Sequence, residues 1–146
     1  MKKLFLLLVM AACALAIHAQ SAGGDSLYIV FPPNTADLRG VTPEQAIQNS
    51  QAFTKVAQIL LANPQYRILI DGHANPVLRS AREETETLKP LSQQRAEAAA
   101  DLLVEQFKVD RRRLILTGAG GLFPSGTTDP SLNRRVSFIP IQPYAN

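Results

Sequence analysis

The chain has 146 residues, which is enough for one domain of ordinary size and too few for two. Its 15 Lys and Arg against 12 Asp and Glu give a formal net charge of +3. If the N-terminal segment containing Lys2 and Lys3 is removed, 13 basic residues remain against 12 acidic ones, and the net charge is +1. So small a charge gives no support for nucleic-acid binding, and no apolar run beyond the leader is long enough to span a bilayer.

The first part of the chain is typical of a secretory signal peptide. Two lysines open it, Leu4 to Met10 form an uncharged apolar run, and small residues follow as far as Ala19. We expect cleavage after Ala19, with cleavage after Ala16 as an alternative, and localisation in the periplasm. The expected division is a signal peptide at 1–19, a short leader at 20–26 and one domain at 27–146.

The single cysteine, Cys13, lies inside this segment. The stretch from Met10 to Cys13 partly resembles a bacterial lipobox, with Met10 in place of the usual leucine, and its use would tether the protein to the outer membrane through lipidated Cys13. Ordinary cleavage is favoured because a second small-residue site follows Cys13. The remaining domain would then have no cysteine, so it requires a hydrophobic core and not disulfides for stability.

The first half of the domain reads as a strand followed by a helix. Residues 27–31 are rich in β-forming side chains, and Pro32-Pro33 stops them. Thr42, Pro43 and Gln45 have the spacing of a capping box, which predicts a helix from there to about Ala62. Three-and-four spacing predicts its buried stripe, namely Phe53, Val56, Ala57, Leu60 and Leu61.

The second half contains three further predicted strands and one helix. The strands are expected at 66–71, 114–117 and 135–139, and the helix at 93–107 with Ser92 as its cap. The polar stretch at 77–90 reads as a surface loop that could contain a helical turn. The order βαβαββ predicts an α/β (α+β) fold, with a mixed four-stranded sheet and two main helices packed on it.

Nothing in the sequence favours catalysis or a metal. His73 is the only histidine after the expected leader, and no Cys or His cluster accompanies it, so a packing role at the end of a strand is more probable than metal ligation. The glycines at 118–121 do not open a helix with phosphate-binding spacing, and no serine lies in a nucleophile-elbow context. We therefore expect a protein that is not an enzyme and has no cofactor.

Two arginine-containing motifs instead indicate binding of an anionic group. A guanidinium offers a planar fork of donors that fits a carboxylate with two hydrogen bonds. Arg95 lies near the expected start of the second helix, where pairing with a neighbour such as Asp71 is the simpler interpretation from spacing alone. Side chains alternate along a strand, so only one of Arg134 and Arg135 can face a shared groove, and we expect it to be Arg134.

Five short motifs occur in the order found in one known family. From about Leu27 to Ile141 the chain resembles the OmpA-like peptidoglycan-binding domain. The motifs are Phe31-Pro32-Pro33-Asn34, Gly72-His73-Ala74-Asn75, Leu91-Ser92-Gln93-Gln94-Arg95-Ala96, Gly118-Ala119-Gly120 with Pro124, and Asn133-Arg134-Arg135-Val136.

The resemblance implies non-covalent binding of the peptide stem of the cell wall. In the family, an aspartate after the second strand and the arginine of the Leu-Ser-x-x-Arg motif hold the zwitterionic end of diaminopimelate. Carried over, Arg95 keeps the arginine role. The expected ligand-binding set is Arg95, Asn75, Asn34, Arg134, Asn133 and His73. Peptidoglycan is the implied partner, together with outer-membrane or other envelope proteins.

This chain departs from the family pattern at the proposed ligand site. Asn75 stands where the family has the clamping aspartate, and loss of that charge would cost about 1.5–3 kcal/mol of binding free energy. Pro32 and Leu88 replace two further polar residues of the family. The stretch from Asn75 to Arg95 is longer than usual, and its acidic centre could supply the missing charge through Glu83, Glu84 or Glu86, or it could cover the groove. An alternative function is therefore a degenerate scaffold or protein-interaction module that no longer binds peptidoglycan.

Overall fold

The structure, a computed structural model, describes residues 27–76 and 80–143. The predicted signal peptide, leader and Cys13 lie outside the described residues. The strands are β1 Tyr28–Val30, β2 Arg67–Gly72, β3 Leu114–Gly118 and β4 Arg135–Ile141, and the main helices are α1 Pro43–Ala62 and α3 Lys89–Phe107, the latter preceded by α2 Ala81–Glu83. Short helical turns lie at η1 Leu38–Gly40, η2 Glu84–Leu88, η3 Arg111–Arg113 and η4 Pro130–Asn133.

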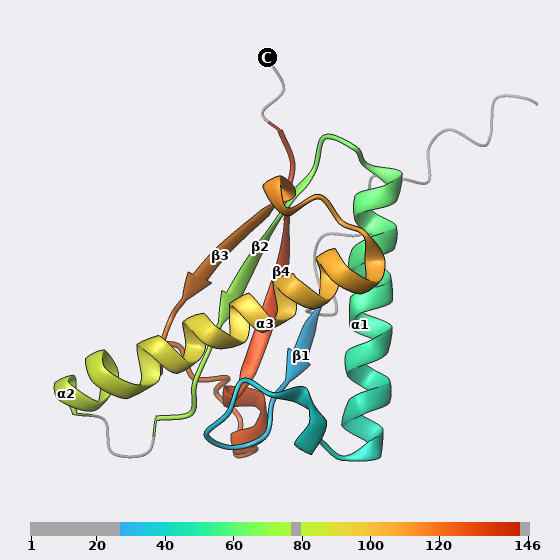
Figure 1. Cartoon of the computed structure of the whole chain (residues 1–146). Coiled ribbons are helices and arrows are strands. Elements are labelled where there is room, and N and C mark those ends of the chain that lie inside the picture. The colour runs from blue at the N-terminus through green and yellow to red at the C-terminus, as the bar shows by residue number, and fades with distance from the viewer. Residues whose placement is uncertain (1–26, 77–79, 144–146) are drawn as a thin grey trace, which may run out of the picture.

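The four strands form one mixed sheet, as the alternation of elements predicted, and their order in the sheet is β1-β4-β2-β3. β4 is antiparallel to both β1 and β2, and β2 is parallel to β3. The carboxyl ends of β1, β2 and β3 therefore meet at one edge of the sheet, together with the amino end of β4 (Figure 1). We call this edge the loop end.

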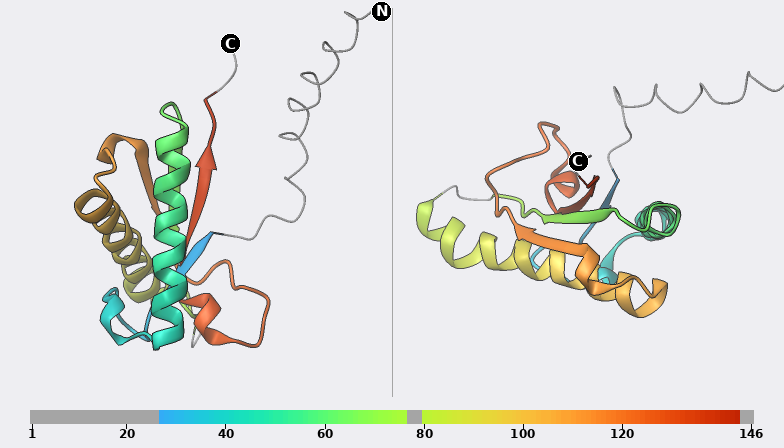
Figure 2. Two further views of the ribbon diagram at one scale, coloured as in Figure 1. Left: turned by 90° about the vertical axis from the view of Figure 1, so that its right-hand side faces the viewer. Right: turned by 90° about the horizontal axis from the view of Figure 1, so that it is seen from above.

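Both main helices pack on one face of the sheet (Figure 2). Alternate residues of β2 and β4 point into this layer, so that Ile68, Ile70, Val136 and Phe138 are buried while their neighbours are partly exposed. The core is completed by residues from both helices and the edge strands, namely Ile29, Phe31, Ala52, Phe53, Val56, Leu60, Ala96, Ala99, Ala100, Leu103 and Leu114.

α1 begins with the predicted capping box. The Thr42 side chain accepts a hydrogen bond from the Gln45 backbone, and the Gln45 side chain accepts one from the Thr42 backbone. The prediction that Leu61 is buried was wrong, since it is 83% exposed. One residue along a helix is a rotation of about 100°, which carries Leu61 away from the stripe containing Leu60.

α1 also carries a buried polar residue that holds the edge strand. Asn49 is 5% exposed, its Oδ1 accepts a hydrogen bond from the Val30 N–H at 2.9 Å, and its Nδ2 donates to the Val30 carbonyl at 2.9 Å. A side-chain amide can satisfy both groups of one residue in this way because it has a donor and an acceptor side by side. The three-residue strand β1 is thus fixed to the helix as well as to β4.

The second helix begins earlier than the sequence predicted. Ser80, not Ser92, is the N-cap, and its Oγ accepts a hydrogen bond from the Glu83 N–H at 3.0 Å. A π-helical turn at Glu84–Leu88 then joins α2 to α3, just before Pro90, which has no N–H to donate to the helix. This extension passes beyond the sheet and exposes most of its side chains, which explains why its sequence lacks apolar periodicity (Figure 1).

α3 packs closely against the backbone of the sheet at the ends of β2 and β3. A Cβ atom on Gly72 would overlap the Ser92 carbonyl, and one on Gly118 would lie 2.8 Å from the Gln93 nitrogen. Ser92 is fully buried at this contact, with its Oγ donating to the Lys89 carbonyl at 2.8 Å and accepting from the Gly120 N–H at 2.9 Å. Two glycines and a small hydroxyl residue therefore set the separation of helix and sheet.

Gly72→Ala should destabilise the fold by about 1–3 kcal/mol, because the added methyl group must push α3 away from β2. The measurement is the free energy of unfolding in urea. Leu61→Ala is the control, since it removes a larger group from an exposed position and should change stability by less than about 0.5 kcal/mol. Equal stability of Gly72→Ala and the wild type would contradict the described contact.

Candidate functional site

The sheet topology brings the predicted ligand-binding residues to the loop end. Asn34 follows β1, His73 and Asn75 follow β2, and Asn133 and Arg134 immediately precede β4. Arg95 reaches the same place from the second turn of α3. Residues that are far apart in the sequence thus lie together, because the carboxyl ends of β1, β2 and β3 meet the amino end of β4.

Arg95 is fully buried at this end, with no exposed surface. Its Nε donates to the Thr35 carbonyl at 2.9 Å, and its two terminal nitrogens donate to the His73 carbonyl at 2.9 Å and the Pro32 carbonyl at 3.1 Å. The guanidinium carbon also lies 5.4 Å from the centre of the Phe31 ring, in cation–π distance. The side chain thereby ties the segment after β1 to the segment after β2.

The charge of Arg95 has no acidic counterpart among the described residues, where every ion pair joins other groups. Burial, and secondly the nearby positive charge of Arg134, lower the pKa of Arg95 to about 10. The group remains protonated at neutral pH. The expected alternative, a pair with Asp71, is not formed, because Asp71 lies beside His73.

Two asparagines and Arg134 surround this buried cation. Asn133 Nδ2 donates to Asn75 Oδ1 at 2.9 Å, and Asn133 Oδ1 accepts from the Ser125 N–H at 2.6 Å. Arg134 is half-buried and its Nε donates to the Phe31 carbonyl at 3.1 Å. Asn75 thus uses its oxygen within the protein, and no described residue accepts a hydrogen bond from its Nδ2. The group that remains available is a donor.

Asn34 is exposed and adopts a left-handed backbone conformation, with φ of 57°. Asparagine tolerates this conformation better than most residues, so a role in the turn accounts for it at this position. No hydrogen bond of its side chain is formed with a described residue.

His73 is buried beside a small polar group on the sheet. Its Nε2 lies 3.2 Å from Asp71 Oδ2, while Asp71 Oδ1 accepts a hydrogen bond from the Thr117 hydroxyl at 2.6 Å. His73 Nδ1 has no partner among the described residues. Burial and the positive charge of Arg135 lower the pKa of His73, and Asp71 opposes this shift without reversing it. The imidazole is therefore neutral at pH 7, which agrees with the packing role expected for it.

The arrangement offers hydrogen-bond donors that could bind an anion. No group of three or more His, Cys, Asp or Glu side chains in the described ranges could hold a metal ion. No helix of the described chain is long and apolar enough to cross a membrane.

Sequence reasoning missed the partners of Arg95 and the contact made by Glu84. The former are backbone carbonyls, which leave no trace in residue types. The Glu84 carboxylate accepts from the Gly121 N–H at 3.0 and 3.2 Å, joining the helical extension to the segment after β3. Glu84 was one of the three acidic residues, with Glu83 and Glu86, that the sequence suggested could fold back toward the site. Only the structure shows which of the three makes this contact.

Comparison with known proteins settles the family. Residues 30–135 match the model of the OmpA family. The chain belongs to the OmpA family. This confirms the resemblance that the five motifs indicated. No curated protein matches the chain.

Solved structures show the same fold at low sequence identity. The OmpA-like domain of FopA1 from Francisella tularensis subsp. tularensis SCHU S4 is 19% identical, with a TM-score of 0.63 over 79% of this chain and 71% of that one. The peptidoglycan-associated lipoprotein from Burkholderia pseudomallei is 23% identical, with a TM-score of 0.60 over 78% and 89% of the two chains. The periplasmic domain of Helicobacter pylori MotB is 16% identical, with a TM-score of 0.58 over 80% and 70%.

Arg95→Met should destabilise the domain by about 2–4 kcal/mol, because three carbonyl oxygens lose a charged donor while the aliphatic volume is largely kept. Arg95→Lys should be intermediate, since an ammonium cannot reach three acceptors arranged for a planar fork. Urea unfolding gives both values. Arg67→Gln, at an exposed position at the start of β2, is the matched control. A loss below about 0.5 kcal/mol for Arg95→Met would show that the carbonyl contacts do not stabilise the loop end.

The lowered pKa of His73 predicts a loss of stability on acidification. As the pH falls below about 6.5, the unfolded chain takes up a proton that the folded imidazole refuses, and the loss continues until the pH reaches the lower folded pKa. His73→Gln should abolish this part of the pH dependence between pH 7.5 and 5.5, as measured by urea unfolding at each pH. Parallel curves for the two proteins would contradict the assignment.

Proposed function

We propose that this domain binds peptidoglycan non-covalently at the loop end, through a carboxylate of the stem peptide, and has no catalytic activity. The observation that carries the proposal is the buried charge of Arg95, which has no acidic partner in the described part of the chain. Burial of a cation costs free energy, and a bound anion would recover part of it. One structural relative, from Burkholderia pseudomallei, is named a peptidoglycan-associated lipoprotein.

The ligand carboxylate would contact Arg134 and Asn75, and Arg95 would act behind them. Arg134 is only half-buried and keeps guanidinium N–H groups beyond the one given to Phe31, while Asn75 keeps its Nδ2 donors. Arg95 lies too deep for direct contact in this conformation, but its charge adds to the potential because a low-dielectric interior screens it weakly. Opening of the segment at 32–35 would be needed for a direct bond.

None of the residues proposed for the site carries a negative charge to pair with the ammonium group of diaminopimelate. Asn75 is neutral and its oxygen already accepts one hydrogen bond from Asn133, and Arg134 is a cation. The proposed binding is therefore to the carboxylate, with lower affinity than a site carrying an aspartate at this position would have.

Arg134→Gln should reduce pelleting of the protein with purified peptidoglycan sacculi by about tenfold in affinity, the scale of one charge-assisted hydrogen bond. Asn75→Asp should increase the affinity for diaminopimelate by a similar factor, because it adds a partner for the ammonium. Arg67→Gln, at the opposite end of β2, should leave both measurements unchanged. Unchanged pelleting of Arg134→Gln would remove the loop end from the proposal.

A scaffold that has lost peptidoglycan binding is the second candidate, and the burial of Arg95 favours it. Under this alternative the guanidinium serves the fold alone, through its three carbonyl contacts. Wild-type protein would then pellet with sacculi no better than an unrelated protein of equal charge, and Asn75→Asp would give no gain with diaminopimelate.

Export to the periplasm is part of the proposal, with removal of residues 1–19 and an unlipidated mature chain. A mass measurement of the protein isolated from cells distinguishes this from cleavage after Ala16 and from an outer-membrane form lipidated at Cys13. The division of the remaining chain into a short leader at 20–26 and a domain at 27–146 is likewise part of the proposal.

A further inference from the structure

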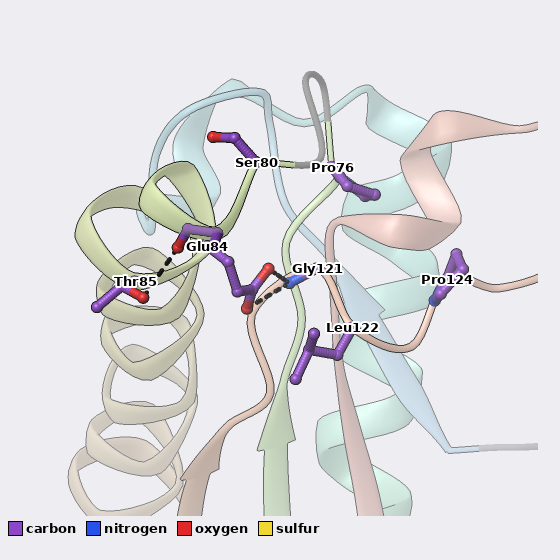
Figure 3. A pocket seen from close by; sticks show the side chains of 8 residues that line it. Pro76, Ser80, Glu84, Thr85, Gly121, Leu122 and Pro124 are labelled. Carbon is purple, nitrogen blue, oxygen red and sulfur yellow. Dashed lines mark hydrogen bonds between the residues drawn. The ribbon is translucent and has the colours of Figure 1, made fainter.

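A cleft of about 540 Å³ lies beside the loop end, between the helical extension and the segment after β3 (Figure 3). Its size falls within the range of about 300–1,000 Å³ that is usual for ligand sites. The described residues that line it come from the end of the β2 segment, from the extension and from the loop after β3, namely Pro76, Ser80, Ala81, Glu84, Thr85, Gly121, Leu122 and Pro124. It shares none of these with the residues assigned to carboxylate binding.

The Glu84 carboxylate is the only charged group among these lining residues. It is held by the Gly121 N–H, which both of its oxygens share, and Figure 3 shows it reaching across from the helix to that backbone. One N–H uses little of the capacity of a carboxylate, which can accept about four hydrogen bonds. No described Lys, Arg or His lies within ion-pair distance of Glu84.

The hydroxyl groups in the cleft also leave acceptors available. Thr85 Oγ1 donates its proton to the Ala81 carbonyl at 3.0 Å, so its lone pairs remain, and Ser80 Oγ keeps a lone pair besides the one given to Glu83. The first turn of the helix adds a partial positive charge near Ser80. A cation would therefore lie toward the Glu84 carboxylate rather than at the tip of the helix.

The rim of the cleft is apolar. Leu122 is 65% exposed and Phe123 is 63% exposed, next to each other in the loop after β3. Pro76 and Pro124 add two more rigid apolar groups to the lining of the cleft (Figure 3). A polymer of sugars and short peptides has little apolar surface with which to cover these side chains, whereas a protein segment has.

We propose that this cleft docks a segment of another protein that carries a lysine flanked by apolar residues. The lysine ammonium would bind Glu84, its aliphatic stem would lie along Leu122 and Pro76, and a neighbouring apolar side chain would cover Phe123. Charge complementarity selects the cation, and the exposed apolar pair selects a protein over a glycan as its carrier. The proposal goes beyond peptidoglycan binding and uses different residues.

The test is a titration of ¹⁵N-labelled protein with the acetylated and amidated peptide Ala-Leu-Lys-Leu-Ala, followed by amide chemical shifts. Saturable shifts are expected at Gly121, Leu122 and Thr85. The same peptide with Nε-acetyllysine should bind about tenfold more weakly, since it keeps the stem and loses the charge. Absence of saturable shifts with the lysine peptide, or equal affinity for both peptides, would overturn the proposal.

Glu84→Gln should weaken the lysine peptide by about tenfold, while its side-chain oxygen can still accept from Gly121 and so keep the loop in place. Glu86→Gln is the matched control, because Glu86 lies on the same helix but pairs with Arg82 on its exposed side and should leave affinity unchanged. Phe123→Ser removes an exposed group, so loss of affinity in this variant cannot be attributed to unfolding. Unchanged binding by Glu84→Gln would overturn the proposal.

A parallel titration with diaminopimelate, a component of the stem peptide, distinguishes the two proposals. Shifts at Asn75 and Arg134 with diaminopimelate, and none at Gly121 or Thr85, support both. If diaminopimelate instead moves the amides of the cleft, the cleft belongs to peptidoglycan binding and the protein partner is rejected. Failure of the lysine peptide alone leaves the loop-end proposal standing.

Discussion

The contact of one buried guanidinium with three backbone carbonyls holds the loop end together. Arg95 joins the segments after β1 and β2, which are neither adjacent in the sheet nor close in sequence. The carbonyls belong to irregular segments that no strand partner satisfies at these positions, and burial makes each unpaired oxygen costly. No neutral side chain offers the same planar set of donors as a guanidinium. Satisfying these three carbonyls with one side chain therefore requires burial of a positive charge.

That charge links the architecture to the proposed binding. A structural arginine satisfied by carbonyls alone keeps its full charge, and Arg134 beside it adds a second. No described carboxylate lies within ion-pair distance of either guanidinium, and the charge of Asp129 acts on Arg134 only from further away, so the two arginines leave a local excess of positive charge at the loop end. In the proposed function Arg95 would serve both the fold and the binding of an anion, so removing Arg95 alone cannot separate the two, while Arg134 and Asn75 can be changed nearer the surface.

The sequence predicted the fold well at positions where residue type depends directly on burial or on helix capping. The capping box at Thr42 and the β-forming runs at 66–71 and 135–139 placed the first helix and these strands to within two residues, because burial and capping depend on residue type. Prediction failed for the start of the second helix, whose extension is stabilised by the Ser80 cap and has no apolar face. It also could not place Arg95 in the interior, because the carbonyls that hold it come from loops whose paths the residue types do not determine.

The longer connection between β2 and α3 changes the distribution of charge around the loop end. Asn75 is neutral and its oxygen accepts a hydrogen bond from Asn133, so neither of these residues brings a negative charge to the loop end. The acidic group in this region is Glu84, which the extended helix carries to the opposite side of the loop after β3. That loop contributes Gly121 and Leu122 to the cleft, and its later part contacts Asn133 through Ser125. In the two proposals this loop separates the surface that would bind a carboxylate from the cleft that would bind an ammonium group.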